Sequence, residues 1–206
     1  MLKIWGRKNS SNVRKVLWCA EEAGVGYQRL DAGGAFGVVD QPEFLARNPN
    51  GQVPVLEDGD LLLWESNSIV RYLAAAYAPG LLYREDPATR ARGDKWMDWT
   101  TSSFAGEFRT LFWGTLRTPP EQRDRAAIEA ARQRCIALLA VPEQALGEHD
   151  YLSGDTFGMG DIPLGSFIYA WFEMPIERPP QANLQAWYAR LLERPAYRRA
   201  VMSELT

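Results

Sequence analysis

The sequence predicts a mixed α/β domain of residues 1–77, a linker of residues 78–88 and an all-helical domain of residues 89–206. Two observations carry this prediction. Up to residue 77, short apolar runs alternate with helical patterns, and an Asp-Gly turn between two apolar runs indicates a β-hairpin. After the proline-bearing linker, the apolar residues recur with helical spacing.

The first domain is expected to hold a four-stranded mixed sheet. It opens with a strand–helix–strand unit, whose helical crossover makes the first two strands parallel. The hairpin then adds antiparallel strands. The expected strands are residues 2–5, 27–30, 53–56 and 61–64, with helices beginning near residues 10–12, 42 and 66.

The second domain is expected to consist of helices throughout. Pro142 is expected to end or kink one helix early, because proline lacks the amide hydrogen and crowds the preceding turn. The expected helical segments are residues 88–116, 121–146, 158–172, 184–192 and 196–201.

The composition excludes several kinds of chemistry. The chain has one histidine, His149, and two distant cysteines, Cys19 and Cys135. We therefore expect no zinc cluster and no disulfide framework beyond one bridge. A mechanism that depends on a protein imidazole or thiol is also disfavoured.

Charge and hydropathy point to a cytoplasmic protein. The net charge of −3 gives no general attraction to nucleic acid or to anionic lipid. The first residues lack the apolar core of a secretory signal, and no apolar run approaches the ~20 residues that span a membrane. We expect no nucleic-acid partner and no membrane association.

The hairpin begins with an unusual proline. Pro54 stands at the entry of a predicted strand, where it cannot donate to the sheet. The Val53–Pro54 bond is one of the few kinds that can be cis. A cis bond would turn the Val53 backbone groups toward the open end of the sheet, where an extended peptide-like ligand could pair with them. The alternative is an ordinary proline at a strand entry.

Two predicted helix N-termini fall at the same end of the sheet. At one, Ser66 and the helix dipole favour a carboxylate and Glu65 suits an ammonium, so an amino-acid end would fit. At the other, Ser10 and its neighbours favour a thiolate by the same effects. Plain helix capping is the alternative at both. Together with the hairpin, they describe a slot for a short peptide that carries a thiol.

Residues 42–59 and 63–73 together resemble the glutathione-binding half of a glutathione S-transferase. The resemblance implies a thioredoxin-like first domain, an all-helical second domain, a homodimer, glutathione as co-substrate and no metal. It also implies five glutathione contacts: Gln52, Val53, Pro54, Glu65 and Ser66.

Residues 6–14 resemble the serine-type classes of that family, which are theta, phi and zeta-like. The resemblance implies that a serine contacts the glutathione sulfur. Ser10 has the best spacing, and Ser11 and Asn12 remain alternatives. No tyrosine stands nearby, and Cys19 lies inside the predicted helix, so the tyrosine-type and cysteine-type mechanisms are disfavoured.

The second substrate is expected to be a small electrophile. Arg109 interrupts an apolar stretch, where its guanidinium could hold a carboxylate. Trp113, Arg117 and, from the first domain, Arg7 are the other candidates for this site. The alternative is a surface arginine whose stem lies on aromatic rings.

These features predict an enzyme that joins the glutathione thiolate to an electrophile. A non-catalytic ligand-binding module and a glutathione-dependent peroxidase or disulfide reductase are the alternatives. One departure from the family concerns folding: Gly158 replaces the usual Ser or Thr of a capping box that ends at Asp161. We expect this helix to be capped more weakly.

Overall fold

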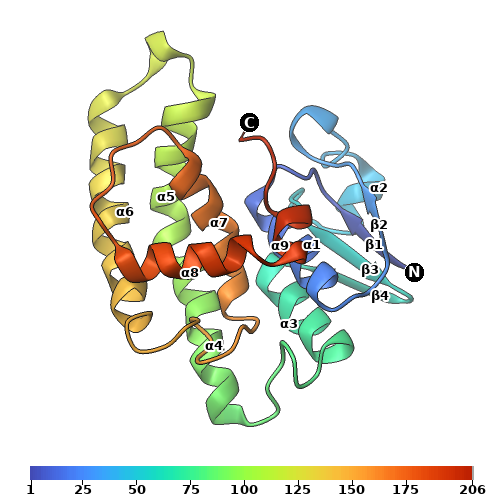
Figure 1. Ribbon diagram of the computed structural model, residues 1–206. Helices are drawn as coiled ribbons and strands as arrows, with labels where there is room; N and C mark the ends of the chain where they lie inside the picture. The colour runs from blue at the N-terminus through green and yellow to red at the C-terminus, as the bar shows by residue number, and fades with distance from the viewer. Residues whose placement is uncertain (206) are drawn as a thin grey trace. The chain divides into compact units, whose positions relative to one another are not determined.

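The computed structural model describes residues 1–205. They form two compact units, which are drawn in Figure 1. Residues 1–85 and 194–203 make up the first unit, and the second unit is built on residues 86–193. The last helix of the chain therefore belongs to the first unit.

The first unit contains a mixed four-stranded sheet in the order β2-β1-β3-β4. The first two strands are parallel, and both β3 and β4 join in antiparallel fashion, which confirms the predicted mixed sheet. The third strand begins two residues later than expected, because Pro54 has no amide hydrogen to donate. The strands are β1 (Leu2–Trp5), β2 (Tyr27–Leu30), β3 (Val55–Asp58) and β4 (Leu61–Trp64).

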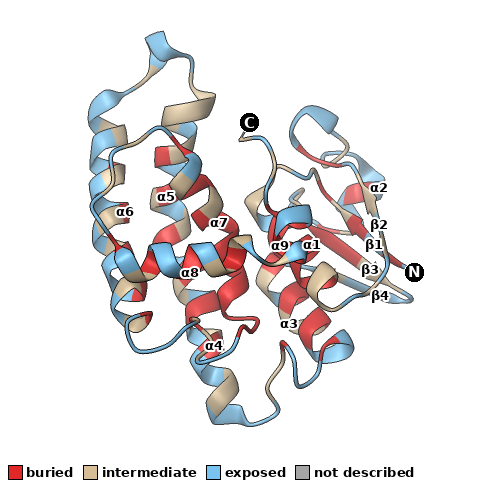
Figure 2. Ribbon diagram, viewed as in Figure 1, coloured by how far each residue is buried: buried red, intermediate tan, exposed pale blue. Residues whose placement is uncertain are grey.

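Helices pack on this sheet. Figure 1 shows α1 and α3 side by side, and Figure 2 shows their buried faces together with the buried residues of β1 and β3. The helices of this unit are α1 (Ser11–Glu22), η1 (Gly34–Phe36), α2 (Pro42–Leu45), α3 (Ser66–Tyr77) and α9 (Pro195–Ala200). The core between sheet and helices includes the fully buried Ile4, Leu56 and Leu73.

Helix α9 is joined to α1 by both apolar and charged contacts. The Tyr197 ring lies edge-on to the Trp18 ring, with 4.7 Å between ring centroids. Just before α9, the guanidinium of Arg194 donates from two nitrogens to the carboxylate of Glu22, at 2.7 and 2.8 Å. The end of the chain thus contributes to the core of the first unit.

The second unit is helical, as predicted. The expected helix over residues 88–116 is an unbroken helical run, but two π-helical segments interrupt its α-helical pattern. Its helices are α4 (Pro87–Trp99), η2 (Thr100–Phe104), α5 (Ala105–Phe112), η3 (Trp113–Arg117), η4 (Pro120–Gln122), α6 (Arg125–Ala145), α7 (Asp161–Glu173) and α8 (Ala182–Leu192). Helix α7 is the most buried of them (Figure 2).

Pro142 does not end its helix early. Helix α6 continues to Ala145, so the expectation of an early end was wrong. The proline stands in the last turn, where only a few residues follow it. The Leu146 amide still donates to the Pro142 carbonyl at 2.9 Å, which closes the helix normally.

Asp161 compensates for the missing hydroxyl at the start of α7. Its fully buried carboxylate accepts hydrogen bonds from the backbone amides of Leu152 at 2.8 Å and Gly158 at 3.1 Å. It also accepts one from the Trp187 indole at 3.0 Å. The acidic half of the capping box is therefore present, and it ties α7 to the preceding loop and to α8.

Candidate functional site

Ser10 immediately precedes α1. Its backbone is extended (φ −83°, ψ 125°), and its hydroxyl makes no capping hydrogen bond to the helix. The helix is instead closed through the backbone, since the Arg14 amide donates to the Ser10 carbonyl at 2.9 Å. The Ser10 hydroxyl therefore stands at a helix N-terminus without serving as its cap.

The start of α3 is linked to α1 through Ser66. The Ser66 hydroxyl donates to the side-chain oxygen of Asn12 at 3.4 Å and accepts from the ammonium of Lys15 at 3.4 Å. Ser66 and Lys15 are both buried, whereas Asn12 is exposed. Two of the predicted site residues, Asn12 and Ser66, are thus brought together.

Lys15 is a buried charged residue beside the predicted site residue Ser66, and it was not among the residues predicted from the sequence. Burial lowers the pKa of Lys15 to about 8, and the negative charge of Glu65 opposes this effect. The one local signal in the sequence is that Lys15 follows Asn12 by three positions in a predicted helix, which places the two side chains on one face. That spacing places a positive charge beside a predicted site residue.

Glu65 has an uncommon backbone. It precedes α3 with φ +73° and ψ 111°, a region that non-glycine residues rarely adopt. Such conformations cost of order 1–3 kcal/mol and are concentrated at functional sites. The side chain of Glu65 is exposed, while the neighbouring Ser66 is buried.

The Val53–Pro54 bond is cis. Val53 lies close to the loop before α1: a Cβ atom built on Gly6 would be 3.3 Å from the Val53 Cβ and only 2.4 Å from a methyl group of Val13. The neighbouring Gln52 backbone carbonyl accepts a hydrogen bond from the side-chain NH2 of the buried Asn48 at 2.8 Å. The hairpin entry is therefore packed against the N-terminal region of α1.

Arg7 lies in the same part of the first unit. Its guanidinium approaches the glycine loop, with Nη1 3.2 Å from a Cβ atom built on Gly33 and Nε 3.1 Å from one built on Gly34. Both glycines have positive φ, and side chains at these positions would crowd the arginine. Burial lowers the pKa of Arg7 from its usual value.

The other three electrophile candidates lie in the second unit. Arg109 is exposed on α5, and Trp113 and Arg117 follow it at intervals of four residues along the helical run. The Arg117 guanidinium lies 5.0 Å from the centroid of the Trp113 ring and 5.3 Å from that of Phe112. The structure therefore brings Arg117 and Trp113 together as a cation–π pair.

Comparison with known families decides the identity of the chain. Residues 1–75 match the family model of the glutathione S-transferase N-terminal domain, and residues 108–195 match that of the C-terminal domain. The chain belongs to the glutathione S-transferase family.

Individual relatives agree with this assignment. Glutathione S-transferase GstB of Escherichia coli is 48% identical over 98% of both chains. Glutathione S-transferase 1 of Zea mays is 30% identical, covering 95% of this chain and 93% of its own. The theta-class enzyme of Xanthomonas axonopodis pv. citri, solved with glutathione bound, superposes with a TM-score of 0.98 at 65% identity, over 100% of this chain and 99% of its own.

The family settles the general features of this glutathione S-transferase. The first domain is thioredoxin-like, the second is helical, and glutathione is the co-substrate. Among residues 1–205, no group of three or more His, Cys, Asp or Glu side chains is placed to hold a metal ion. Within the same residues, no helix is long and apolar enough to cross a membrane.

Proposed function

We propose that this glutathione S-transferase conjugates the glutathione thiolate to a small electrophile and that the Ser10 hydroxyl stabilises the thiolate. The observation that supports Ser10 is its hydroxyl, which stands at the N-terminus of α1 and makes no capping bond. Asn12 is the weaker alternative, because its side-chain oxygen already accepts a hydrogen bond from Ser66. Ser11 is the remaining alternative, as the first residue of the helix itself.

The glutamyl end of glutathione would lie at the start of α3. There, backbone N–H groups and the Ser66 hydroxyl favour a carboxylate, and the Glu65 carboxylate favours an ammonium. The buried ammonium of Lys15, 3.4 Å from the Ser66 hydroxyl, adds positive charge beneath the carboxylate position. At the hairpin, Gln52 and the backbone of Val53 beside Pro54 would pair with the extended middle of the tripeptide.

The reaction then needs no protein base. A hydroxyl donor and a helix N-terminus lower the pKa of the bound thiol, so that its proton leaves to solvent. The thiolate sulfur attacks the electrophilic carbon, forming the S–C bond. In a substitution, the bond from that carbon to the leaving group breaks, and the leaving group departs with the electron pair. Holding both reactants in position supplies a further part of the rate acceleration.

The electrophile would carry an acidic group. Arg109, Trp113 and Arg117 follow one another at four-residue intervals, so they lie near one face of the helical run. A planar carboxylate suits an arginine guanidinium, and an aryl group suits the exposed Trp113 ring.

The test of the serine role compares Ser10→Ala with Ser11→Ala. The pKa of bound glutathione is measured by titrating the thiolate absorbance, together with turnover of an aryl halide. Ser10→Ala is expected to raise that pKa and cut turnover, while glutathione binding by calorimetry largely survives. Unchanged rate–pH profiles in both variants would contradict the proposal that a serine stabilises the thiolate. Binding without turnover on any electrophile would instead favour the binding module.

We also propose a homodimer. Strand β4 is at the edge of the sheet, and its residues Leu61, Leu62 and Trp64 are 38–40% exposed. Large apolar side chains exposed along a sheet edge are a common basis for association. Light scattering of the purified protein checks this, with a monomer mass as the outcome that contradicts it.

A further inference from the structure

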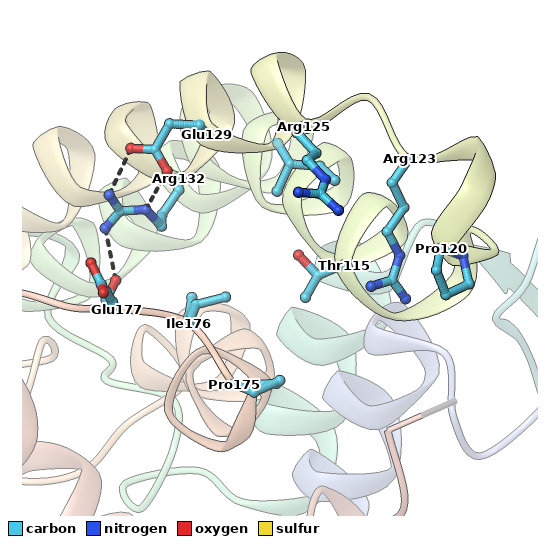
Figure 3. Close-up of a pocket in the computed structure, with 10 residues that line it drawn as sticks. Thr115, Pro120, Arg123, Arg125, Glu129, Arg132, Pro175, Ile176 and Glu177 are labelled. Carbon is cyan, nitrogen blue, oxygen red and sulfur yellow. Dashed lines mark hydrogen bonds and ion pairs between the residues drawn. The ribbon is translucent and has the colours of Figure 1, made fainter.

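A pocket of about 390 Å³ lies within the second unit. Its walls come from η3 and η4, the first turns of α6 and the segment that follows α7. Figure 3 shows its side chains arranged around a common space, with Thr115 between the α6 side and the Pro175–Ile176 side. None of the residues predicted for glutathione or for the electrophile lines it.

One of the three arginines around this pocket is already paired. Arg132 donates to the two carboxylate oxygens of Glu129 at 2.6 and 2.8 Å, and to the backbone carbonyl of Glu177 at 2.8 Å. Figure 3 shows this group at one end of the pocket. Its charge and its donors are therefore largely satisfied within the protein.

The other two arginines, Arg123 and Arg125, keep more hydrogen-bond donors available for a ligand. The Nε of Arg123 donates to the Thr118 carbonyl at 2.9 Å, which fixes the side chain. Within residues 1–205, the guanidinium of Arg125 makes no hydrogen bond or ion pair. The nearby Asp124 carboxylate is engaged in capping, since it accepts from the Ala127 amide at 2.9 Å. Figure 3 shows both guanidinium groups over the space beside Thr115.

The remaining wall is largely apolar. Ile128, Pro175 and Ile176 supply hydrocarbon surface to the pocket. Figure 3 shows Pro175 and Ile176 across the space from Arg123 and Arg125. In the same wall, the Thr115 hydroxyl oxygen is buried and has no hydrogen-bond partner among the described residues. A buried polar group without a partner costs about 1–3 kcal/mol. Such a group is therefore uncommon in the wall of a pocket that binds no ligand.

We propose that this pocket is a second ligand site, which binds a small amphipathic carboxylate independently of glutathione. Two guanidinium groups suit a planar carboxylate because each can donate two parallel hydrogen bonds to it. The apolar wall suits a hydrocarbon or aryl body of the same molecule. The pocket is lined by three arginines and two glutamates, so its side chains carry a net charge of about +1. That charge favours a monoanion over a phosphate dianion.

The experiment is calorimetric titration with 4-phenylbutyrate, in the presence of saturating S-hexylglutathione to occupy the catalytic site. Saturable binding with one ligand per chain is expected. The matched neutral probe is 4-phenylbutyramide, which has the same apolar body and lacks the charge. It is expected to bind at least about tenfold more weakly, because charge-assisted hydrogen bonds are lost. No saturable carboxylate binding, or equal affinity for both probes, would overturn the proposal.

The double variant Arg123→Gln/Arg125→Gln locates the site. It is expected to weaken 4-phenylbutyrate binding at least about tenfold, whereas turnover of an aryl halide with glutathione stays unchanged. Arg92→Gln is the matched control, since it removes one exposed arginine from α4 and should bind like the wild type. Wild-type affinity in the double variant would refute this location, even if the serine-assisted reaction is confirmed. Binding that is abolished by S-hexylglutathione would instead assign the carboxylate to the catalytic site.

Discussion

The ammonium nitrogen of Lys15 lies 3.4 Å from the hydroxyl oxygen of Ser66, and both side chains are buried. Placing a lysine inside a protein is costly unless it is paired or hydrogen-bonded. Here the position lies between the first turns of α1 and α3, where the proposed glutathione carboxylate would bind. Lys15 is therefore expected to affect both the stability of the first unit and the charge at the proposed glutathione site.

Replacing Lys15 with Met should change how stability depends on pH. The pKa is lowered from 10.5 in the unfolded chain to about 8 in the folded protein. Between these values the unfolded chain binds more protons, so the free energy of unfolding should rise by up to about 3 kcal/mol from pH 8 to pH 10.5. In Lys15→Met this rise should be absent. Urea unfolding at several pH values measures it.

The matched control for that experiment is Lys95→Met, which removes an exposed lysine from α4. It should keep the wild-type pH dependence. If Lys15→Met also kept it, the lysine would not be the titrating group. At pH 7, Lys15→Met should also raise the KM for glutathione while leaving kcat less affected, because it removes positive charge from the proposed carboxylate position.

Asp161→Asn should destabilise the second unit. The carboxylate is fully buried and accepts from the Leu152 and Gly158 amides and from the Trp187 indole. Asparagine offers a single acceptor oxygen and turns two N–H donors toward these donors. The free energy of unfolding should fall by about 2–4 kcal/mol, measured by chemical denaturation.

Asp155→Asn is the control for Asp161, because Asp155 is an exposed residue of the loop before α7 and pairs with His149. Surface changes of this kind are usually within about 0.5 kcal/mol. Equal effects of the two substitutions would show that the hydrogen bonds to Asp161 contribute little.

Arg109→Ala should alter substrate preference rather than general activity. If its exposed guanidinium holds the acid group of the electrophile, kcat/KM should fall at least about tenfold for electrophiles with a carboxylate and little for their neutral analogues. Arg134→Ala is the control, since Arg134 is an exposed arginine that pairs with Glu107. Equal losses for acidic and neutral electrophiles would contradict the role of Arg109.

Tyr197→Ala should destabilise the first unit, although the residue lies near the end of the sequence. The fully buried ring packs edge-on against Trp18, and losing a buried aromatic ring typically costs about 3–5 kcal/mol. Amide hydrogen exchange of α1 should increase accordingly. Arg199→Ala removes only the exposed ion pair with Glu21 and should cost less than about 1 kcal/mol. Similar losses in both variants would argue against the aromatic contact as the cause.

The sequence predicts best what depends on local chemistry. The Asp58-Gly59 pair predicts the hairpin between β3 and β4, and the polar residues before α1 and α3 predict their starts. The burial of Lys15 was not predicted, because it depends on packing against α3, which is distant in sequence. The π-helical segments of the long helical run leave no local signature. The contact between Trp18 and Tyr197 joins residues with most of the chain between them, so no short pattern reveals it.

The position of α9 has a consequence for biosynthesis. The first unit needs residues 194–203, yet these are made only after the whole helical unit has been synthesised. In topological terms, the second unit is an insertion within the first. A ribosome-bound chain can therefore form the sheet and α1 early, but the Trp18 face of α1 stays uncovered until residues 194–203 have been synthesised. The helical unit, although it comes later in the sequence, is the first that can be complete.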